Sequence, residues 1–284
     1  MRKLKDKLII FGLTGFIAKN LIKLLKSKKC EYIAYGKVDL DLTNSLKSNI
    51  KLKEIDFTNA TIVFLSAIRP KQGEELTVSI KNLSMIKNLI ENINLKVINQ
   101  FIYISSDAVY PFTQEVISEK TLTGPETLYG HMHCMREKYL SDIIPKEKLT
   151  IFRPCAIYGE GETIFSYGIN GFIRQAFENK TISLFGKGEE MRDHIFVKDF
   201  VNMIFESYKK KIIGLFNVAT GNSKSFYELA IFIIGNFKEK VNINYKPRKV
   251  IIKQRSFDIL NTTYSFKKIK INSIESGITK MLKI

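Results

Sequence analysis

The segment Gly12–Ala18 has the residue types and the spacing to bind a phosphate group. It follows an apolar run, Leu8–Phe11, and precedes apolar residues at helical spacing. A glycine at a tight turn lets the backbone approach a diphosphate, and the helix N-terminus that follows offers free N–H groups and a partial positive charge. Ala18 stands where a small residue lets helix and strand pack closely. The candidate cofactor-binding residues are therefore Gly12, Thr14, Gly15, Phe16, Ile17 and Ala18; the alternative is a plain tight turn.

The end of the next strand bears on the choice of cofactor. Many dinucleotide-binding chains place an acidic residue about 20 positions after the glycines, where it binds the ribose hydroxyls. Here the strand ends in Tyr35-Gly36-Lys37, without a carboxylate. Lys37 could bind a 2′-phosphate, which would favour NADP, or it could be a solvated loop residue. The choice between NAD and NADP stays open.

Strands and helices are expected to alternate along most of the chain. Helical spacing covers Leu76 to about Asn94 and Leu128–Ser141, and a Ser225–Glu228 capping box opens a later helix. Apart from that helix and one opened by Asn272–Glu275, the last third looks irregular. Strands separated by helices imply βαβ units and a parallel sheet. The expected strands are Leu8–Phe11, Glu31–Tyr35, Thr61–Leu65, Phe101–Ile104 and Leu149–Phe152.

Length and composition limit the class of protein. The 284 residues suggest roughly two domains, and no run approaches the about 18 apolar residues of a membrane span. Cys30, Cys134 and Cys155 form neither a disulfide framework nor a metal-ligand pattern, so we expect no metal and a reducing, cytoplasmic setting. Basic Met1–Lys7 and the apolar residues after it imitate a signal peptide, but glycines interrupt the run and no small-residue cleavage site follows.

The chain is strongly basic. Its 45 Lys and Arg outnumber 28 Asp and Glu, for a net charge of +17. Such a charge can indicate a nucleic-acid or anionic-membrane partner. The lysines are scattered, however, without an arginine-rich block, so we expect no nucleic-acid partner. A general positive field would still help to capture an acidic small substrate.

Two further segments bring a family resemblance. Phe101–Tyr110 ends a buried strand with hydroxyl groups, and Leu128–His133 begins a helix. Together with Gly12–Ala18, they resemble the extended short-chain dehydrogenase/reductase family of sugar-nucleotide epimerases, dehydratases and 4-keto-reductases. The resemblance covers the whole chain, because later segments match the family in order: Arg153-Pro154, Ile157–Gly159, Phe185–Gly188, Arg192–Asp199, Phe216–Gly221 and Arg255–Asp258.

The resemblance implies a fold and a function. The fold would be α/β, a Rossmann-type doubly wound parallel sheet with a smaller C-terminal substrate-binding α/β domain. The dinucleotide domain would take residues 1–156 and about 195–222, and the substrate domain about 157–194 and 223–284. The enzyme would use NAD or NADP to transfer hydride at C4 of a nucleoside-diphosphate sugar, as a 4-keto-reductase or epimerase. The family's usual setting is surface-glycan precursor synthesis, and its members often form homodimers.

The resemblance also implies residue roles. Tyr129 would be the proton donor and acceptor, with Ser106 hydrogen-bonded to the same substrate oxygen. The pair Asp41-Leu42 would lie near the adenine, and Ser66-Ala67 along the cofactor. Further contacts would come from Pro154 on the nicotinamide side, from Asp107 on the substrate, and from Arg192 and Arg255 on the nucleotide diphosphate.

Three positions depart from the family pattern. His133 replaces the lysine that follows the tyrosine by four residues, although this spacing still puts it beside Tyr129 on one helix face. An imidazole with a pKa of about 6.5 is mostly neutral near pH 7.5, so it supplies a weaker field than lysine and would sharpen the pH dependence. Ala108 lacks the carboxylate that dehydratases use as a base, and Ala156 replaces an asparagine that contacts diphosphate. The alternative function is a cofactor-binding sensor or structural partner without turnover.

Overall fold

The computed structural model describes residues 6–69, 74–113, 115–162, 168–248, 252 and 254–282. The chain forms two compact units. Unit 1 comprises Met1–Pro111, Thr121–Arg153 and Val201–Phe216. Unit 2 comprises Phe112–Lys120, Pro154–Phe200 and Asn217–Ile284. In the described part of the chain, no helix is both long enough and apolar enough to cross a membrane.

Unit 1 is built on a six-stranded sheet whose order is β11-β6-β4-β3-β1-β2. Its strands are β1 (Lys7–Phe11), β2 (Ile33–Tyr35), β3 (Ala60–Phe64), β4 (Gln100–Ile104), β6 (Leu149–Pro154) and β11 (Gly214–Val218). The pairs β1–β2, β1–β3, β3–β4 and β4–β6 are parallel. After β1 the chain forms β2 on one side of β1 and then crosses over to form β3 on the other side of β1. A doubly wound sheet binds its ligands where the strand order reverses in this way, outside the carboxyl ends of the strands.

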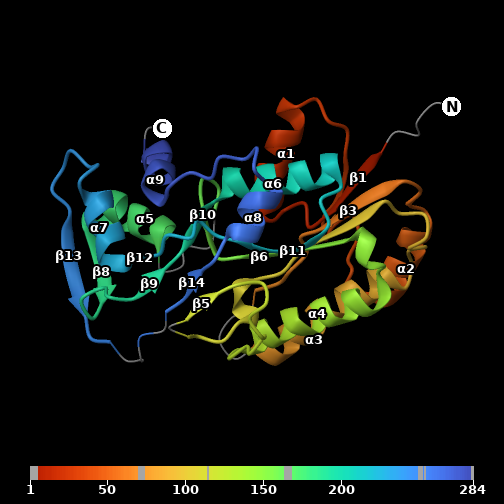
Figure 1. Cartoon of the computed structure of the whole chain (residues 1–284), viewed down its shortest axis with the longest axis horizontal. Helices are drawn as coiled ribbons and strands as arrows, with labels where there is room; N and C mark the ends of the chain where they lie inside the picture. Colours follow the sequence, from red (N-terminus) through yellow and green to blue (C-terminus); the bar gives the residue numbers. More distant parts are fainter. Residues whose placement is uncertain are drawn as a thin grey trace. The chain divides into compact units, whose positions relative to one another are not determined.

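Helices cover both faces of this sheet (Figure 1). One face carries α1 (Phe16–Ser27) and α6 (Val197–Lys210), and the other α2 (Ser45–Lys53), α3 (Glu75–Ile90) and α4 (Leu128–Ile143). Two short 3₁₀ turns, η1 (Asp107–Val109) and η2 (Lys146–Lys148), complete the unit. Every residue of β3 and β4 is buried, because both faces of these central strands are covered.

Unit 2 contains short strands paired two by two, with helices around a separate apolar core. The pairs are β7 (Ala156–Tyr158) with β10 (His194–Phe196), β9 (Met191–Arg192) with β12 (Lys224–Ser225), β8 (Thr181–Phe185) with β13 (Asn242–Lys246), and β5 (Val116–Ile117) with β14 (Ser256–Phe257). Its helices are α5 (Ile169–Asn179), α7 (Phe226–Ile234), α8 (Leu260–Ser265) and α9 (Ile274–Leu282). The core includes Phe172, Phe196, Phe226 and Leu229.

The predicted strands and helices of the first half of the chain are confirmed, with their ends shifted by a few residues, but α2 was not predicted. The Ser225–Glu228 capping box is also present. The chain after β7 is more regular than predicted: α5 and α6 were missed, and so were β8 and β13. Gly168 precedes α5 without any side-chain cap, so the local start signal for this helix is absent.

The last helix begins one residue later than the predicted signal suggests. Asn272 binds the carboxylate of Asp199 with its backbone and side-chain nitrogens instead of capping the helix. The hydroxyl of Ser273 accepts a hydrogen bond from the backbone nitrogen of Ser276 at 3.1 Å and so caps α9.

Candidate active site

Gly12 lies where the turn after β1 comes against the end of β3. Its φ of +107° suits glycine, and a Cβ there would be 2.9 Å from both the carbonyl carbon of Leu65 and the nitrogen of Ser66. The backbone nitrogens of Gly12 and Leu13 donate to the Tyr35 carbonyl at 2.9 and 3.1 Å. The turn is therefore held against both neighbouring strands, with no room for a side chain at Gly12.

The N-terminus of α1 follows this turn directly. Gly15 is its N-cap and makes no side-chain hydrogen bond, and the first turn carries no acidic residue. The first-turn N–H groups, at Phe16, Ile17 and Ala18, lack partners within the helix. Thr14 and Gly15 are exposed, whereas the Ala18 side chain is fully buried against the sheet. The arrangement fits an anionic group placed over the helix end.

The loop after β2 holds its own acidic groups in local hydrogen bonds. Asp39 accepts from the backbone nitrogen of Gly36 at 3.0 Å, and Lys37 between them is exposed. Asp41 accepts from the nitrogen and the hydroxyl of Thr43. Burial alone would raise the pKa of Asp41, but these hydrogen bonds outweigh it and the pKa is lowered. The predicted residue beside it, Leu42, has its side chain in the core.

A close contact brings the start of α4 onto η1. A Cβ on Gly130 would lie 2.2 Å from the carbonyl oxygen of Ala108 and 2.7 Å from Cβ of Pro125. Thr127 caps α4 by accepting from the nitrogen of Gly130 at 3.1 Å. The hydroxyl of Ser106 caps η1 by accepting from the nitrogen of Ala108 at 3.1 Å. The helix that carries Tyr129 thus begins against the turn that Ser106 begins.

Tyr129 and His133 are neighbours on α4, as their spacing predicts. Their ring centroids are 4.6 Å apart and their planes make an angle of 77°. Burial raises the pKa of the Tyr129 phenol, the charges of Arg69 and Arg136 oppose this rise, and that of Asp107 adds to it. At neutral pH the phenol is therefore protonated and able to donate a proton.

His133 is buried and neutral. Its Nδ1 lies 2.6 Å from the hydroxyl oxygen of Tyr103 in β4. Its Nε2 is buried and has no hydrogen-bond partner among the described residues. Burial, and secondarily the charge of Arg136, lower the pKa of His133 to about 3. The imidazole therefore does not titrate near neutral pH. The expectation that it would sharpen the pH dependence there is wrong.

The other residues predicted for the cofactor lie near the ends of the central strands. Ser66 follows β3, and its carbonyl oxygen accepts from Nη1 of Arg136 at 3.0 Å. Ala67 beside it is exposed. Pro154 is the buried last residue of β6. Asp107, which was predicted to contact the substrate, begins η1, and its carboxylate lies 3.4 Å from the Ser106 hydroxyl.

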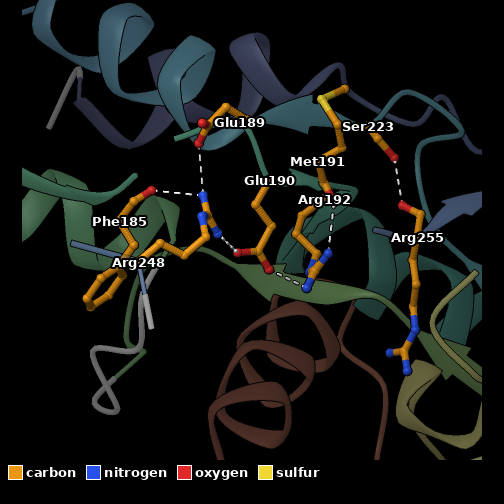
Figure 2. Close-up of polar contacts among 8 residues, drawn as sticks. All are labelled: Phe185, Glu189, Glu190, Met191, Arg192, Ser223, Arg248 and Arg255. Atoms are coloured by element: carbon orange, nitrogen blue, oxygen red, sulfur yellow. Dashed lines mark hydrogen bonds and ion pairs between the residues drawn. The ribbon is translucent and has the colours of Figure 1, made fainter. Parts of the chain in front are cut away.

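Unit 2 brings the two predicted arginines onto one aromatic ring. The guanidinium carbon of Arg192 lies 5.2 Å from the ring centroid of Phe112, and that of Arg255 lies 4.0 Å from it. In Figure 2 the side chains of Arg192 and Arg255 both extend downward. Guanidinium groups are well suited to binding the oxygens of a phosphate or diphosphate.

Glu190 is a neighbour of these arginines that the sequence did not indicate. Its carboxylate forms ion pairs with Arg192 and Arg248 (Figure 2). Arg248 also pairs with Glu189 at 3.0 Å and donates to the Phe185 carbonyl at 2.9 Å. Arg192 is thus held by a carboxylate from its own strand region.

Comparison with known proteins identifies the family. Residues 8–219 match the sequence model of the NAD dependent epimerase/dehydratase family. The chain belongs to this family. The match spans the turn at Gly12, the Ser106 segment and the helix of Tyr129, which were the basis of the resemblance.

Solved structures of similar fold include several members of known activity. ADP-L-glycero-D-manno-heptose-6-epimerase from Helicobacter pylori has a TM-score of 0.85 and 19% identity, with 100% of this chain and 98% of that chain covered. dTDP-4-dehydrorhamnose reductase from Bacillus anthracis, in complex with NADP, has a TM-score of 0.83, 21% identity and 99% coverage of both chains. UDP-glucose 4-epimerase from Thermus thermophilus, in complex with NAD, has a TM-score of 0.83, 16% identity and 98% coverage of both.

This member of the epimerase/dehydratase family has a buried polar cluster, reached by the helix of Tyr129, that the sequence did not indicate. Glu137 pairs with Arg153 and accepts from the hydroxyl of Ser105, and Arg153 donates to the Tyr110 hydroxyl at 2.8 Å. Arg136 is fully buried beside this cluster. The available signal was two charged residues at positions seven and eight after Tyr129, on the same helix.

Proposed function

We propose that this protein is an NAD- or NADP-dependent enzyme that transfers hydride at C4 of a nucleoside-diphosphate sugar, as a 4-keto-reductase or an epimerase. The supporting observation is the contact of Gly130 with Ala108, which sets the helix of Tyr129 against the turn of Ser106. A protonated phenol and a hydroxyl on adjoining turns can both address one substrate oxygen.

The turn at Gly12 fits a dinucleotide. The space that a Cβ would fill is bounded by the backbone of Leu65 and Ser66, just after β3, and α1 presents uncapped N–H groups. A diphosphate would accept from these groups, and Pro154 would lie toward the nicotinamide. Lys37 is exposed, and Asp39 is hydrogen-bonded to the backbone of its own loop. Lys37 would therefore bind a 2′-phosphate, which favours NADP. The dinucleotide, when bound, supplies or accepts the hydride.

Tyr129 would be the proton donor in the reductive reaction. In the reductive direction, its Oη–H donates a proton to the sugar carbonyl oxygen as hydride reaches the carbonyl carbon, and the phenolate left behind regains a proton from solvent. The raised pKa of Tyr129 keeps the phenol protonated at neutral pH, so the proton to be donated is present. Ser106 would donate to the same oxygen. Ala108 provides no base, so dehydration is disfavoured.

The substrate class follows from the arginines. Arg192 and Arg255 beside Phe112 would bind the diphosphate of the sugar nucleotide. The turn at Gly12 that would bind the dinucleotide belongs to unit 1, and the two arginines belong to unit 2. We further propose that the enzyme acts in the cytoplasm, in the synthesis of surface-glycan precursors, and that it forms a homodimer.

The experiment is a panel assay. Purified protein is mixed with NAD or NADP and with nucleoside-diphosphate sugars and their 4-keto derivatives, and the absorbance of reduced nicotinamide is followed while NMR identifies epimerised product. We expect turnover with at least one sugar, its loss in Tyr129→Phe, and its retention in Tyr139→Phe, which alters another half-buried tyrosine of α4. Turnover that survives Tyr129→Phe would contradict the assignment.

One observation favours the alternative of a cofactor-binding protein without turnover. The motif lysine is replaced by a neutral, buried imidazole with a pKa of about 3. Dinucleotide binding with no redox change across the whole panel would support this alternative and reject the enzyme.

A further inference from the structure

Arg136 is a buried cation behind the candidate catalytic tyrosine. It lies seven residues after Tyr129 on α4, and its side chain is fully buried. Nε donates to the Asn82 carbonyl at 3.0 Å, Nη2 donates to the same oxygen, and Nη1 donates to the Ser66 carbonyl at 3.0 Å. The guanidinium carbon lies 5.2 Å from the ring centroid of Phe64.

All the polar partners of Arg136 in the described part of the chain are uncharged. Backbone carbonyls, the amide of Asn82 and the hydroxyl of Tyr103 surround it, and no carboxylate pairs with it among the described residues. Glu137, the next residue along the helix, pairs with Arg153 instead. A guanidinium stays protonated in proteins, and a buried charge without a counter-ion is costly to maintain. Such a charge is best explained by an anion that forms beside it.

The groups between Arg136 and Tyr129 are connected. The charge of Arg136 opposes the rise that burial causes in the pKa of Tyr103. The hydroxyl of Tyr103 lies 2.6 Å from Nδ1 of His133, and the ring of His133 meets the ring of Tyr129 with centroids 4.6 Å apart.

We infer that Arg136 supplies the permanent positive charge that the motif lysine would otherwise give, and that it stabilises the phenolate of Tyr129 from inside the protein. Arg136 is a positioning residue: it acts on the Tyr129 phenol through its electric field, not by touching substrate. The inference rests on the proposed role of Tyr129 as proton carrier.

Other charges also face Tyr129 and must be separated from Arg136. Arg69, in the loop after β3, lowers its pKa more than Arg136 does, and Asp107 of η1 raises it. Arg69 is exposed, so salt in the solvent screens its charge, whereas a fully buried guanidinium is screened far less. Ionic strength therefore distinguishes the two arginines.

The experiment measures the ionisation of residue 129 directly, without turnover. Tyr129 is replaced by a polyfluorinated tyrosine whose phenol ionises near neutral pH, and fluorine NMR records its pKa at low and high salt in the full chain without added nucleotide. In Arg136→Gln, which keeps donors but removes the charge, we expect the pKa to rise by about one unit, a tenfold loss of phenolate, at both salt concentrations. In Arg136→Lys it should stay within about half a unit of the parent.

Control variants make the outcome unambiguous. In Arg69→Gln the pKa of residue 129 should rise at low salt, and this rise should disappear at high salt. His133→Gln exchanges one neutral side chain for another and should move the pKa of residue 129 by less than about half a unit. An unchanged pKa in Arg136→Gln at high salt would overturn the inference, and so would a His133→Gln shift as large as that of Arg136→Gln.

A second variant covers the case in which Arg136→Gln does not fold. In His133→Lys the added amine would stand beside an existing cation and lose its own proton, so the pKa of residue 129 should change by less than about half a unit. A fall of one unit or more would show that the site lacks a cation and would overturn the inference. Failure of the sugar panel would reject the proposed function but leave this measurement valid.

Discussion

The hydroxyl of Tyr103 and Nδ1 of His133 are 2.6 Å apart in the interior of unit 1. This hydrogen bond orients the imidazole that occupies the motif-lysine position, and Nε2 of the same ring has no hydrogen-bond partner among the described residues. The group beside Tyr129 is thus a neutral imidazole, and the cation that we propose for this site is Arg136, three residues further along the helix.

Gly130 should tolerate no side chain. In Gly130→Ala, the new Cβ would meet the Ala108 carbonyl at 2.2 Å, so α4 must move away from η1. We expect the free energy of unfolding to fall by about 2 kcal/mol in denaturant titrations, and turnover to fall because Tyr129 moves with the helix. Gly235→Ala is the matched control, because a Cβ there has only ordinary contacts beyond 3.4 Å. Equal stability of the two variants would contradict the close contact.

His133 should make the protein less stable in acid. Its pKa is about 3 in the folded state, against about 6.5 when unfolded, so the unfolded state binds a proton first as the pH falls. The stability contributed by the neutral ring is complete above pH 6.5 and is lost as the pH falls toward 3. Between pH 7 and pH 5, His133→Gln should therefore lose about 2 kcal/mol less unfolding free energy than the parent.

Exposed His131 on the same helix provides the control for this measurement. Denaturant titrations at several pH values should give parallel curves for His131→Gln and the parent. Buried His194, whose pKa burial lowers to about 4, remains in both variants and keeps part of the slope. A His133→Gln curve parallel to the parent would show that the ring is not buried in the neutral form.

Glu137 should be essential to stability. Its carboxylate binds Arg153 and the Ser105 hydroxyl inside unit 1, so Glu137→Gln leaves a buried guanidinium unpaired. We expect a loss of about 3–5 kcal/mol in unfolding free energy. Asp142→Asn removes an exposed partner of Lys138 on the same helix and should cost less than about 1 kcal/mol. Similar losses in the two variants would contradict the buried pair.

Arg255 should govern affinity for the sugar nucleotide. Its side chain is 6% exposed and stacks on Phe112 at 4.0 Å. Lysine lacks the planar fork and the stacking surface, so Arg255→Lys should raise KM about tenfold with little change in kcat. Arg174→Lys, an exposed substitution on α5, should leave both constants unchanged. Binding of a nucleoside diphosphate by calorimetry checks the same point without turnover, and unchanged affinity would remove Arg255 from the site.

The sequence by itself determined the local parts of this protein. The alternation of apolar runs predicted the parallel sheet, because buried central strands must be apolar throughout. The turn at Gly12 was recognisable because only glycine fits its φ of +107°. The pairing of Tyr129 with His133 followed from their spacing on one helix.

Only the tertiary structure decided the charge at the candidate site. Whether His133 is charged depends on burial and on Tyr103, which is 30 residues away in the chain. In the local sequence Arg136 is an ordinary basic residue on a helix. Its buried position depends on contacts such as its hydrogen bond to the Ser66 carbonyl, 70 residues away. Local spacing fixes which side chains share a helix face, but desolvation and partners distant in sequence fix their protonation, and these arise only when the chain is folded.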